Sequence, residues 1–156
     1  MEKKEHKSRA HLVFTLDDQF YGVDTSAVTQ IIRSVALTLI PDGPPLLSGL
    51  LNLHGDIVPV IDIRRQLKRV QKIMDTGDRI VVVSVNNLLA AFVCDDIKGI
   101  VAIDILTAKN APKIHPDLAD VLSAVGRLNE KTVLIYDTKA LFPADKIAEI
   151  HKRIKA

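Results

Sequence analysis

The sequence has one cysteine, no tryptophan, and only 2 tyrosines and 4 phenylalanines among its 156 residues. A single cysteine cannot form an intramolecular disulfide, which excludes a small disulfide-stabilised fold. Few aromatic side chains means few stacking platforms of the kind that single-stranded nucleic acids need. No uncharged run is long enough for a membrane-spanning helix, and no apolar stretch follows the basic start as in a signal peptide. We therefore expect a cytoplasmic protein with no direct membrane insertion.

The sequence also has no large excess of charge of one sign, because the formal net charge is only +2. This balance does not argue for a nucleic-acid partner. The most basic stretch, Arg64–Arg69, could attract phosphate, but a solvated helix face with buried apolar stems explains it more simply. Since 47% of the residues are hydrophobic and only 7 are glycine and 7 proline, the sequence predicts a folded globular domain.

The residue patterns of common catalytic and metal sites are missing. The five histidines are scattered, and neither a CxxC nor an HExxH pair occurs. Both phosphate-loop patterns, GxxxxGK[ST] and GxGxxG, are also absent. Cys94 ends an apolar run and is expected to be a small buried hydrophobe rather than a nucleophile. We expect no catalytic residue, metal or cofactor, and we interpret Asp17-Asp18, Asp62 and Asp95-Asp96 as turn and cap residues.

What the sequence does contain is many short runs of strand-forming residues separated by turn signals. The turn at His54-Gly55-Asp56 joins two strands, the second of which Pro59 demotes to an edge or a bulge. Helical spacing of Ala27, Val28, Ile31 and Ile32 predicts a short amphipathic helical turn. The other predicted strands cover residues 11–16, 20–23, 35–40, 79–85, 88–94, 121–128 and 132–136, and the other helices cover 63–73 and Asp145 to the end.

The two halves of the chain weakly repeat each other. Val60–Arg64 resembles Ile135–Lys139, since each has an apolar strand end, an aspartate, and a basic residue two positions later. The pair Val28 and Ile31 resembles the pair Ile97 and Ile100 in the same way. Offsets of about 70 to 75 residues are typical of two small β-subdomains rather than of a solenoid.

The segment Gly49–Arg64, GLLNLHGDIVPVIDIR, resembles the G-x-x-N-L-R-G-x-x-V-P-V-x-D-L-R pattern of the CheW family of chemotaxis coupling proteins. The resemblance extends over about residues 10–143. It implies a mainly β fold of two five-stranded β-barrel subdomains with short helices and a C-terminal helix. The expected organisation is a flexible basic N-terminus at 1–9, the CheW-like domain at 10–143, and a helix at 144–156.

The resemblance also implies a function and two binding surfaces. Members of the family are non-enzymatic adaptors that join a CheA-type histidine kinase to the cytoplasmic tip of methyl-accepting chemoreceptors. The positions that match the family's receptor groove are Val28, Gln30, Ile31, His54, Ile97 and Ile100. The positions that match its kinase-binding surface are Gly49, Gly55, Asp56 and Ile57. The four aliphatic groove residues could instead belong to the core, and the two glycines could serve turn geometry.

Two positions depart from the family pattern, because Gln30 replaces its glutamate and His54 its arginine. A neutral Gln–His hydrogen bond could replace the ion pair that these positions allow in the family. The paired change favours a divergent chemosensory system, such as one that controls pili or gliding, as an alternative to the standard one. An enzyme or small-ligand module on a similar barrel, or the coupling domain of a larger regulator, also stays open.

Overall fold

The structure, a computed structural model, describes residues 9–107 and 122–155. The predicted flexible terminus therefore falls outside the described residues at 1–8, as do Val121 and Ala156. The described residues form ten strands: β1 (Arg9–Leu16), β2 (Gln19–Asp24), β3 (Val28–Arg33), β4 (Leu47–Leu53), β5 (Asp56–Ile61), β6 (Arg79–Val85), β7 (Leu88–Cys94), β8 (Asp96–Thr107), β9 (Leu122–Leu128) and β10 (Lys131–Tyr136). The short helices are η1 (Thr25–Ala27), α1 (Ile63–Gln66) and α3 (Thr138–Leu141), and the C-terminal helix is α4 (Ala144–Lys155).

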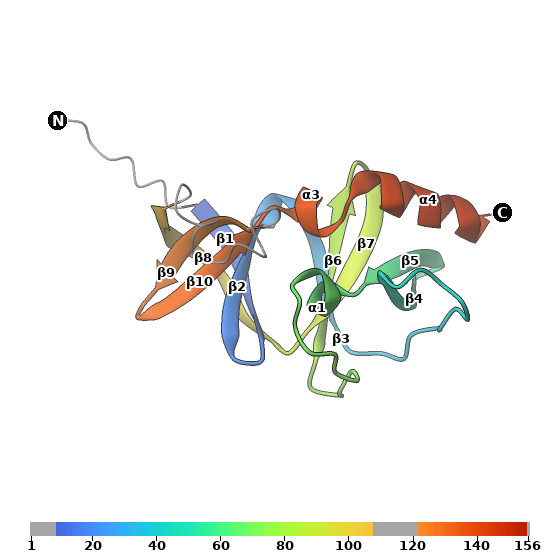
Figure 1. The fold of residues 1–156 in the computed structure, drawn as a ribbon, viewed down its shortest axis with the longest axis horizontal. Coiled ribbons are helices and arrows are strands. Elements are labelled where there is room, and N and C mark those ends of the chain that lie inside the picture. Colours follow the sequence, from blue (N-terminus) through green and yellow to red (C-terminus); the bar gives the residue numbers. More distant parts are fainter. Residues whose placement is uncertain (1–8, 108–121, 156) are drawn as a thin grey trace.

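Strands from both ends of the chain form a closed barrel in the order β1-β2-β10-β9-β8. Strand β1 is antiparallel to both β2 and β8, whereas β10 joins β2 in parallel. The barrel lies on the left in Figure 1, where the blue N-terminal hairpin stands beside the orange strands β9 and β10.

The middle of the chain forms the second five-stranded unit, a sheet in the order β3-β6-β7-β5-β4. Strand β5 meets β7 in parallel through the pair Val60–Ala91. The outer strand β4 is joined on its other side by a single bridge, in which Thr38 and Leu50 exchange two backbone hydrogen bonds of 2.9 and 2.8 Å. The predicted mainly β fold with two five-stranded units is confirmed, although only the first unit has the pairing of a closed barrel.

The two units have corresponding topologies. Read as β8-β1-β2-β10-β9, the barrel matches β3-β6-β7-β5-β4 strand for strand, and both contain one parallel pair. The last strand of each half is followed by a capped short helix. Asp62 follows β5 and caps α1, and Asp137 follows the corresponding strand β10 and caps α3. This confirms the weak internal repeat that the sequence predicts, and with it the interpretation of Asp62 as a cap residue.

One hydrophobic core joins the barrel to the sheet. Leu12 and Phe14 of β1 pack in the same cluster as Val81 and Val83 of β6, and all four side chains are fully buried. The ring of Phe14 lies 4.9 Å from that of Phe92 on β7, measured between centroids. The amphipathic helix α4, which confirms the predicted C-terminal helix, adds residues to the same cluster through its buried face. The shared core keeps the two units together as one packed structure.

Several local predictions are wrong. Residues 28–33 form a strand rather than a helical turn, and residues 35–40 form no strand beyond the bridge at Thr38. The helix predicted for 63–73 ends at Gln66. Pro59 does not mark an edge, because β5 has a strand on each side, and the proline is tolerated where the β5–β7 ladder is only one pair long.

Candidate interaction site at the junction of the two units

A β-bulge explains why β3 shows helical spacing in the sequence. Val28 pairs with Val83 and Ile31 pairs with Val81, so three positions on β3 span only two on β6. The extra residue places Val28 and Ile31 on one face of the strand. Since Val81 and Val83 belong to the shared core, that face is the one directed toward the junction of the two units.

Strand β8 of the barrel contains a corresponding β-bulge. Ile97 pairs with Phe14 and Ile100 with Leu12, and the register shifts between these pairs. Gly99 lies in the bulge with φ of +125°, a conformation that favours glycine. Ile97 and Ile100 therefore share one face of β8, again the face toward the shared core.

In each pair, one member is anchored in the core and the other is exposed. Val28 and Ile97 are partly buried and pack against the shared core. Ile31 is 38% exposed and Ile100 is 60% exposed. The core reading therefore applies to Val28 and Ile97, whereas Ile31 and Ile100 are accessible aliphatic side chains.

The residues assigned to kinase binding lie in three environments. Gly55 and Asp56 are exposed at the tip of the β4–β5 hairpin, where Gly55 has φ of +95°. Ile57 lines a hollow of about 970 Å³ between this hairpin, the loop 40–45 and α4. Gly49 instead lies buried inside β4, where an added Cβ would come within 3.0 Å of both Leu37 Cβ and Thr38 O. Its role is close backbone packing, so the turn geometry predicted for it is wrong.

Gln30 lies on one outer strand of the sheet, β3, and His54 lies in the turn that follows the other outer strand, β4. His54 has a positive φ of 54° beside Gly55 and Asp56. Within the described residues no hydrogen bond joins the two side chains. The structure thus places His54 with the exposed hairpin residues.

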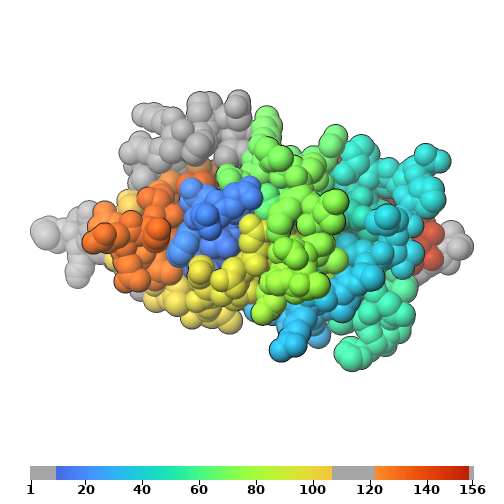
Figure 2. Space-filling view, turned by 90° about the horizontal axis from the view of Figure 1, so that it is seen from below, coloured from blue at the N-terminus to red at the C-terminus, as the bar shows by residue number. Residues whose placement is uncertain are grey.

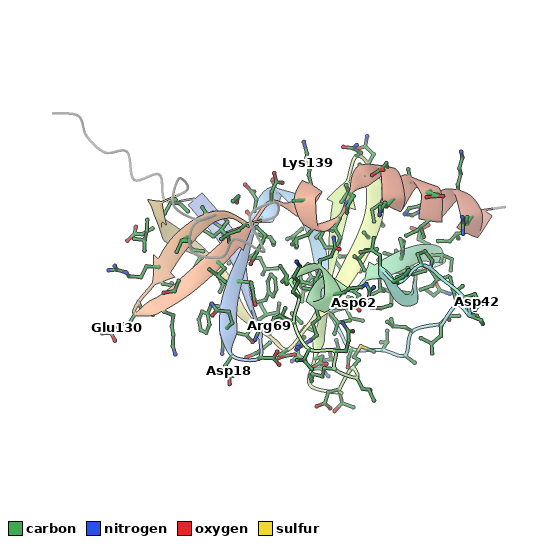
Figure 3. The ribbon with its side chains drawn as sticks, in the orientation of Figure 1. Asp18, Asp42, Asp62, Arg69, Glu130 and Lys139 are labelled. Atoms are coloured by element: carbon green, nitrogen blue, oxygen red, sulfur yellow. The ribbon has the colours of Figure 1, made fainter. Side chains whose placement is uncertain are left out.

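A group of alternating charges crosses the junction beside these strands. Arg64 of α1 donates from Nη1 to Asp17 in the β1–β2 turn and from Nη2 to Asp95 between β7 and β8, both at 2.8 Å. Asp17 also accepts from Arg69 at 3.2 Å, and its own amide donates to Asp95 at 2.7 Å. Figure 3 places Arg69 between β2 and α1. We call these charges, together with Lys72 and Asp78, the junction network.

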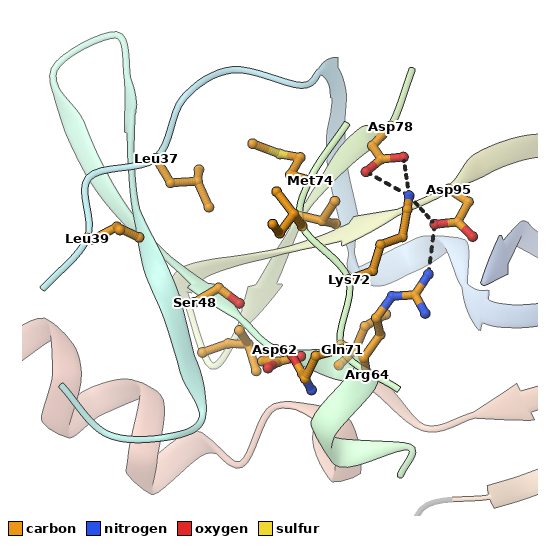
Figure 4. Close-up of a pocket in the computed structure, with 14 residues that line it drawn as sticks. Leu37, Leu39, Ser48, Asp62, Arg64, Gln71, Lys72, Met74, Asp78 and Asp95 are labelled. Carbon is orange, nitrogen blue, oxygen red and sulfur yellow. Dashed lines mark hydrogen bonds and ion pairs between the residues drawn. The ribbon is translucent and has the colours of Figure 1, made fainter. Parts of the chain in front are cut away.

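Lys72 and Asp78 extend the junction network toward β6. The Lys72 ammonium contacts Asp78 at 3.0 Å and Asp95 at 3.2 Å, as the dashed lines in Figure 4 show. Asp78 is buried, and Arg64 has a side chain only 9% exposed. The interpretations of Arg64 as part of a solvated face and of Asp95 as a cap are therefore wrong.

The junction network shifts the pKa values of Asp17, Asp95 and Lys72. Hydrogen bonding from Arg64 lowers the pKa of Asp17 below its ordinary value. Burial would raise the pKa of Asp95, but the Asp17 amide, Arg64 and Lys72 outweigh it and the pKa is lowered. Burial likewise opposes the charge of Lys72, yet its hydrogen bonds to Asp78 and Asp95 raise its pKa. Asp17, Asp95 and Lys72 are therefore held in their ionised forms at neutral pH.

Cys94 is fully buried, as predicted, and burial raises the pKa of its thiol. In the part of the chain that the structure describes, no group of three or more His, Cys, Asp or Glu side chains could hold a metal ion. No helix described there is long and apolar enough to cross a membrane.

Sequence reasoning misses the junction network because its members are far apart in sequence. Asp17, Arg64 and Asp95 each follow a strand, and each has a local explanation as a turn, helix-face or cap residue. The one available signal is the internal repeat, in which Arg64 and Lys139 each stand two positions after the aspartate that follows a strand.

Comparison with known proteins identifies the family of this chain. A family model described as "CheW-like domain" matches residues 10–146. The chain belongs to the CheW-like family. The chemotaxis protein CheW of Klebsiella aerogenes is 26% identical over 146 residues, covering 93% of this chain and 88% of that protein. The CheW of Treponema pallidum is 21% identical over 144 residues, covering 89% and 85%.

Two further proteins resemble this chain, one in its solved structure and one over only part of its sequence. A crystal structure of the scaffolding protein TtCheW from Thermoanaerobacter tengcongensis matches with a TM-score of 0.71 at 24% identity, covering 83% of this chain and 88% of that one. It supports the fold. Protein FrzA of Myxococcus xanthus is 26% identical over 87 residues, which cover 56% of this chain and 54% of FrzA.

Proposed function

We propose that this CheW-like protein is a chemotaxis scaffold that couples chemoreceptors to a CheA-type histidine kinase without catalysing a reaction itself. Family membership over most of the chain carries the proposal, and the named relatives CheW of Klebsiella aerogenes and TtCheW are a chemotaxis protein and a scaffolding protein. The accessible features of the described residues are aliphatic strand faces and hairpin tips, which suit binding to other proteins.

The receptor-binding surface in this proposal consists of the exposed members of the two bulged strands. Ile31 and Ile100 stand on faces directed toward the junction, and each is backed by a partner residue fixed in the core. Anchoring limits the conformational entropy that the exposed side chain loses when a helical receptor tip binds. A helix laid on an apolar face is a common recognition mode.

The kinase-binding surface in this proposal is the β4–β5 hairpin tip with the adjoining hollow. Asp56 supplies an exposed charge, and Ile57 supplies apolar area at the edge of the hollow. Gly55 contributes the turn, whereas the buried Gly49 contributes only the close packing that positions β4.

The test is a binding measurement with purified receptor cytoplasmic fragment and purified kinase from the same organism. Ile31→Asp or Ile100→Asp should weaken receptor binding by about thirtyfold or more, since an uncompensated interface charge costs roughly 2–5 kcal/mol. Leu106→Asp is the matched control, because Leu106 is a comparably exposed aliphatic residue near the far end of β8. Normal receptor binding by both folded isoleucine variants would refute the receptor surface.

The kinase surface has its own matched pair. Asp56→Lys should weaken kinase binding and leave receptor binding unchanged. Glu130→Lys is the control, because Glu130 occupies the turn between β9 and β10 that corresponds to the β4–β5 turn. Equal kinase affinities for the two variants would contradict the assignment.

The partial likeness to FrzA favours one alternative, a coupling role in a divergent chemosensory system. Gln30 and His54, which replace an oppositely charged pair of the family, point the same way. Binding to the organism's non-flagellar kinase, with none to its chemotaxis kinase, would establish this alternative.

A further inference from the structure

Two arginines lie directly opposite each other at one end of the sheet. Arg33 ends β3, Arg79 begins β6, and the two residues are Cα partners in the β3–β6 ladder. Like charges at opposed positions of an antiparallel pair repel each other. β3 ends and β6 begins at the lower edge of Figure 1. Figure 2 views this side, where the green chain that leads into β6 lies between the yellow strand β8 and the light-blue chain of β3 and the loop after it.

Both arginines share the strand face that carries the proposed receptor-binding surface. No register shift separates Ile31 from Arg33, so these two side chains lie on the same face of β3. On β6, Arg79 is two positions from Val81, which pairs with Ile31 and belongs to the shared core. Ile32, between Ile31 and Arg33, packs against the other core cluster, inside the sheet. The arginine pair therefore adds a cationic end to the apolar surface that Ile31 forms.

Within the described residues, no carboxylate pairs with either arginine. The Arg33 side chain is exposed, and it makes neither an ion pair nor a hydrogen bond with them. The Arg79 guanidinium is partly buried and donates from Nη1 to two backbone carbonyls, those of Gly77 at 2.9 Å and Asp78 at 3.1 Å. Both positive charges are therefore left without a negative partner.

The acids near this end of β6 already have cationic partners. Three aspartates act electrostatically on Cys94, the residue that pairs with Arg79 on β7. Each of these acids contacts a cationic side chain within 3.3 Å, in the pairs Asp78–Lys72, Asp95–Arg64 and Asp96–Lys98. None of the three is left to neutralise the arginine pair.

The internal repeat shows that strand pairing does not need charge at these positions. Strands β8 and β1 of the barrel correspond to β3 and β6 of the sheet. Two residues beyond the exposed isoleucine of β3, Arg33 faces Arg79. Two residues beyond the exposed isoleucine of β8, Ala102 faces Ala10. Because an alanine pair completes the same register in the barrel, the two charges in the sheet call for an explanation outside the fold.

We propose that Arg33 and Arg79 form a cationic subsite of the receptor-binding surface and bind a carboxylate on the receptor helix. The inference rests on the proposed function, because its occupant is the helix that contacts Ile31. A carboxylate between the two guanidinium groups offsets their repulsion through charge-assisted hydrogen bonds. An apolar side chain there would leave two desolvated cations without a partner.

The strand spacing predicts where the carboxylate lies on the receptor helix. Ile31 and Arg33 are two residues apart on β3, a distance of about 7 Å along a strand. Four residues of an α-helix rise by about 6 Å. In a helix laid along β3, the carboxylate therefore lies about one turn from the aliphatic residue that contacts Ile31.

The test measures binding of the full chain to the purified receptor cytoplasmic fragment at low and at high salt. Arg33→Gln should weaken binding about tenfold at low salt, and Arg79→Gln should do the same. The affinity of Arg33→Gln should also fall less than that of the wild type as salt is added, because salt screens the lost ion pair. Arg65→Gln is the matched control, because it removes the same charge from an exposed arginine of α1 and should leave receptor binding unchanged.

Ile31→Asp separates a failure of the cationic subsite from a failure of the proposed function. If Ile31→Asp loses receptor binding while Arg33→Gln binds like the wild type, the cationic subsite is wrong and the receptor-binding surface stands. If the wild type does not bind the receptor fragment at all, both are wrong. Weaker binding of Arg33→Gln to the kinase, with receptor binding unchanged, would assign the arginine pair to the kinase and overturn the proposal.

A thermal melt of the free protein tests the repulsion without the receptor. Arg33→Gln should raise Tm by about 1–2 °C at low salt, because it removes one of two opposed like charges. The gain should disappear at high salt, where the charges are screened. A variant that is more stable yet binds the receptor more weakly has not lost binding through loss of structure. A lower Tm for Arg33→Gln at low salt would overturn the proposal, because the charge would then stabilise the fold itself.

Discussion

Substituting Arg64 by glutamine should remove the centre of the junction network while keeping most of its side-chain volume. The guanidinium makes two bonds of 2.8 Å, one to Asp17 and one to Asp95. A hydrogen bond that involves charged groups contributes about 1.5–3 kcal/mol. The loss is smaller than the sum, because Asp17 is 43% exposed and regains water, and Asp95 keeps Lys72. We therefore expect Arg64→Gln to lower the free energy of unfolding by about 2 kcal/mol.

The assay is urea denaturation followed by far-UV circular dichroism, because the protein has no tryptophan to report by fluorescence. A loss of this size corresponds to a fall of about 4–8 °C in Tm for a chain of this length. Arg65→Gln is the matched control: the neighbouring exposed side chain should change stability by less than about 0.5 kcal/mol. Adding Asp95→Asn to Arg64→Gln should cost less than the two separate losses combined, since the two groups share one bond.

An Arg64→Gln variant within about 0.5 kcal/mol of the wild type would refute this reasoning. It would mean that the desolvation of the buried guanidinium cancels its bonds to the two carboxylates. An additive double variant would separately refute the direct coupling of Arg64 to Asp95.

Three other changes have expected outcomes. The pKa of Asp95 is lowered in the fold. Its carboxylate therefore contributes to the free energy of unfolding above the ordinary carboxyl pKa of about 4, and this contribution is lost as the pH falls through the folded pKa. Urea melts between pH 2 and 7 should show that the stability of Asp95→Asn depends less on acid than that of the wild type. Gly126→Ala would place a Cβ in steric conflict with Ile103 Cγ2, so thermal melts should show a loss of about 2 kcal/mol, whereas Gly77→Ala, with nothing within 4 Å, should show little change. Burial raises the pKa of Cys94, so the thiol should react with a disulfide reagent only at the rate of unfolding, and rapid modification of the folded protein would contradict its burial.

The sequence predicts the fold well where local chemistry decides it. Turns at Asn86-Asn87 and His54-Gly55 have the positive φ values that asparagine and glycine allow. The caps at Asp62 and Asp137 follow from short polar side chains placed directly after strands. These features depend on neighbours in sequence, which is why the strands and the internal repeat are readable.

Prediction fails where a distant part of the chain supplies the partner. The spacing of Val28 and Ile31 has the period of a helix, and only pairing with β6 turns the extra residue into a bulge. Arg64 looks like a solvated cation until the β1–β2 turn and the β7–β8 connection bring it two carboxylates. The face shared by Ile97 and Ile100 likewise depends on a register shift against β1.

The arrangement of the barrel has a consequence for the order in which the protein folds during synthesis. The β1–β2 hairpin leaves the ribosome first, but its partner β10 follows much later: Gln19 bonds to Thr132, 113 positions along the chain. The strands of the sheet, β3 to β7, are complete before β8 is made. We expect the early hairpin to dock on this sheet through the contact between the rings of Phe14 and Phe92. The docked hairpin then lacks its partner strand β10 until that strand has been made. Closure of the barrel is then the slow, non-local step, and an unpaired edge of β2 stays exposed in the nascent chain until β10 arrives.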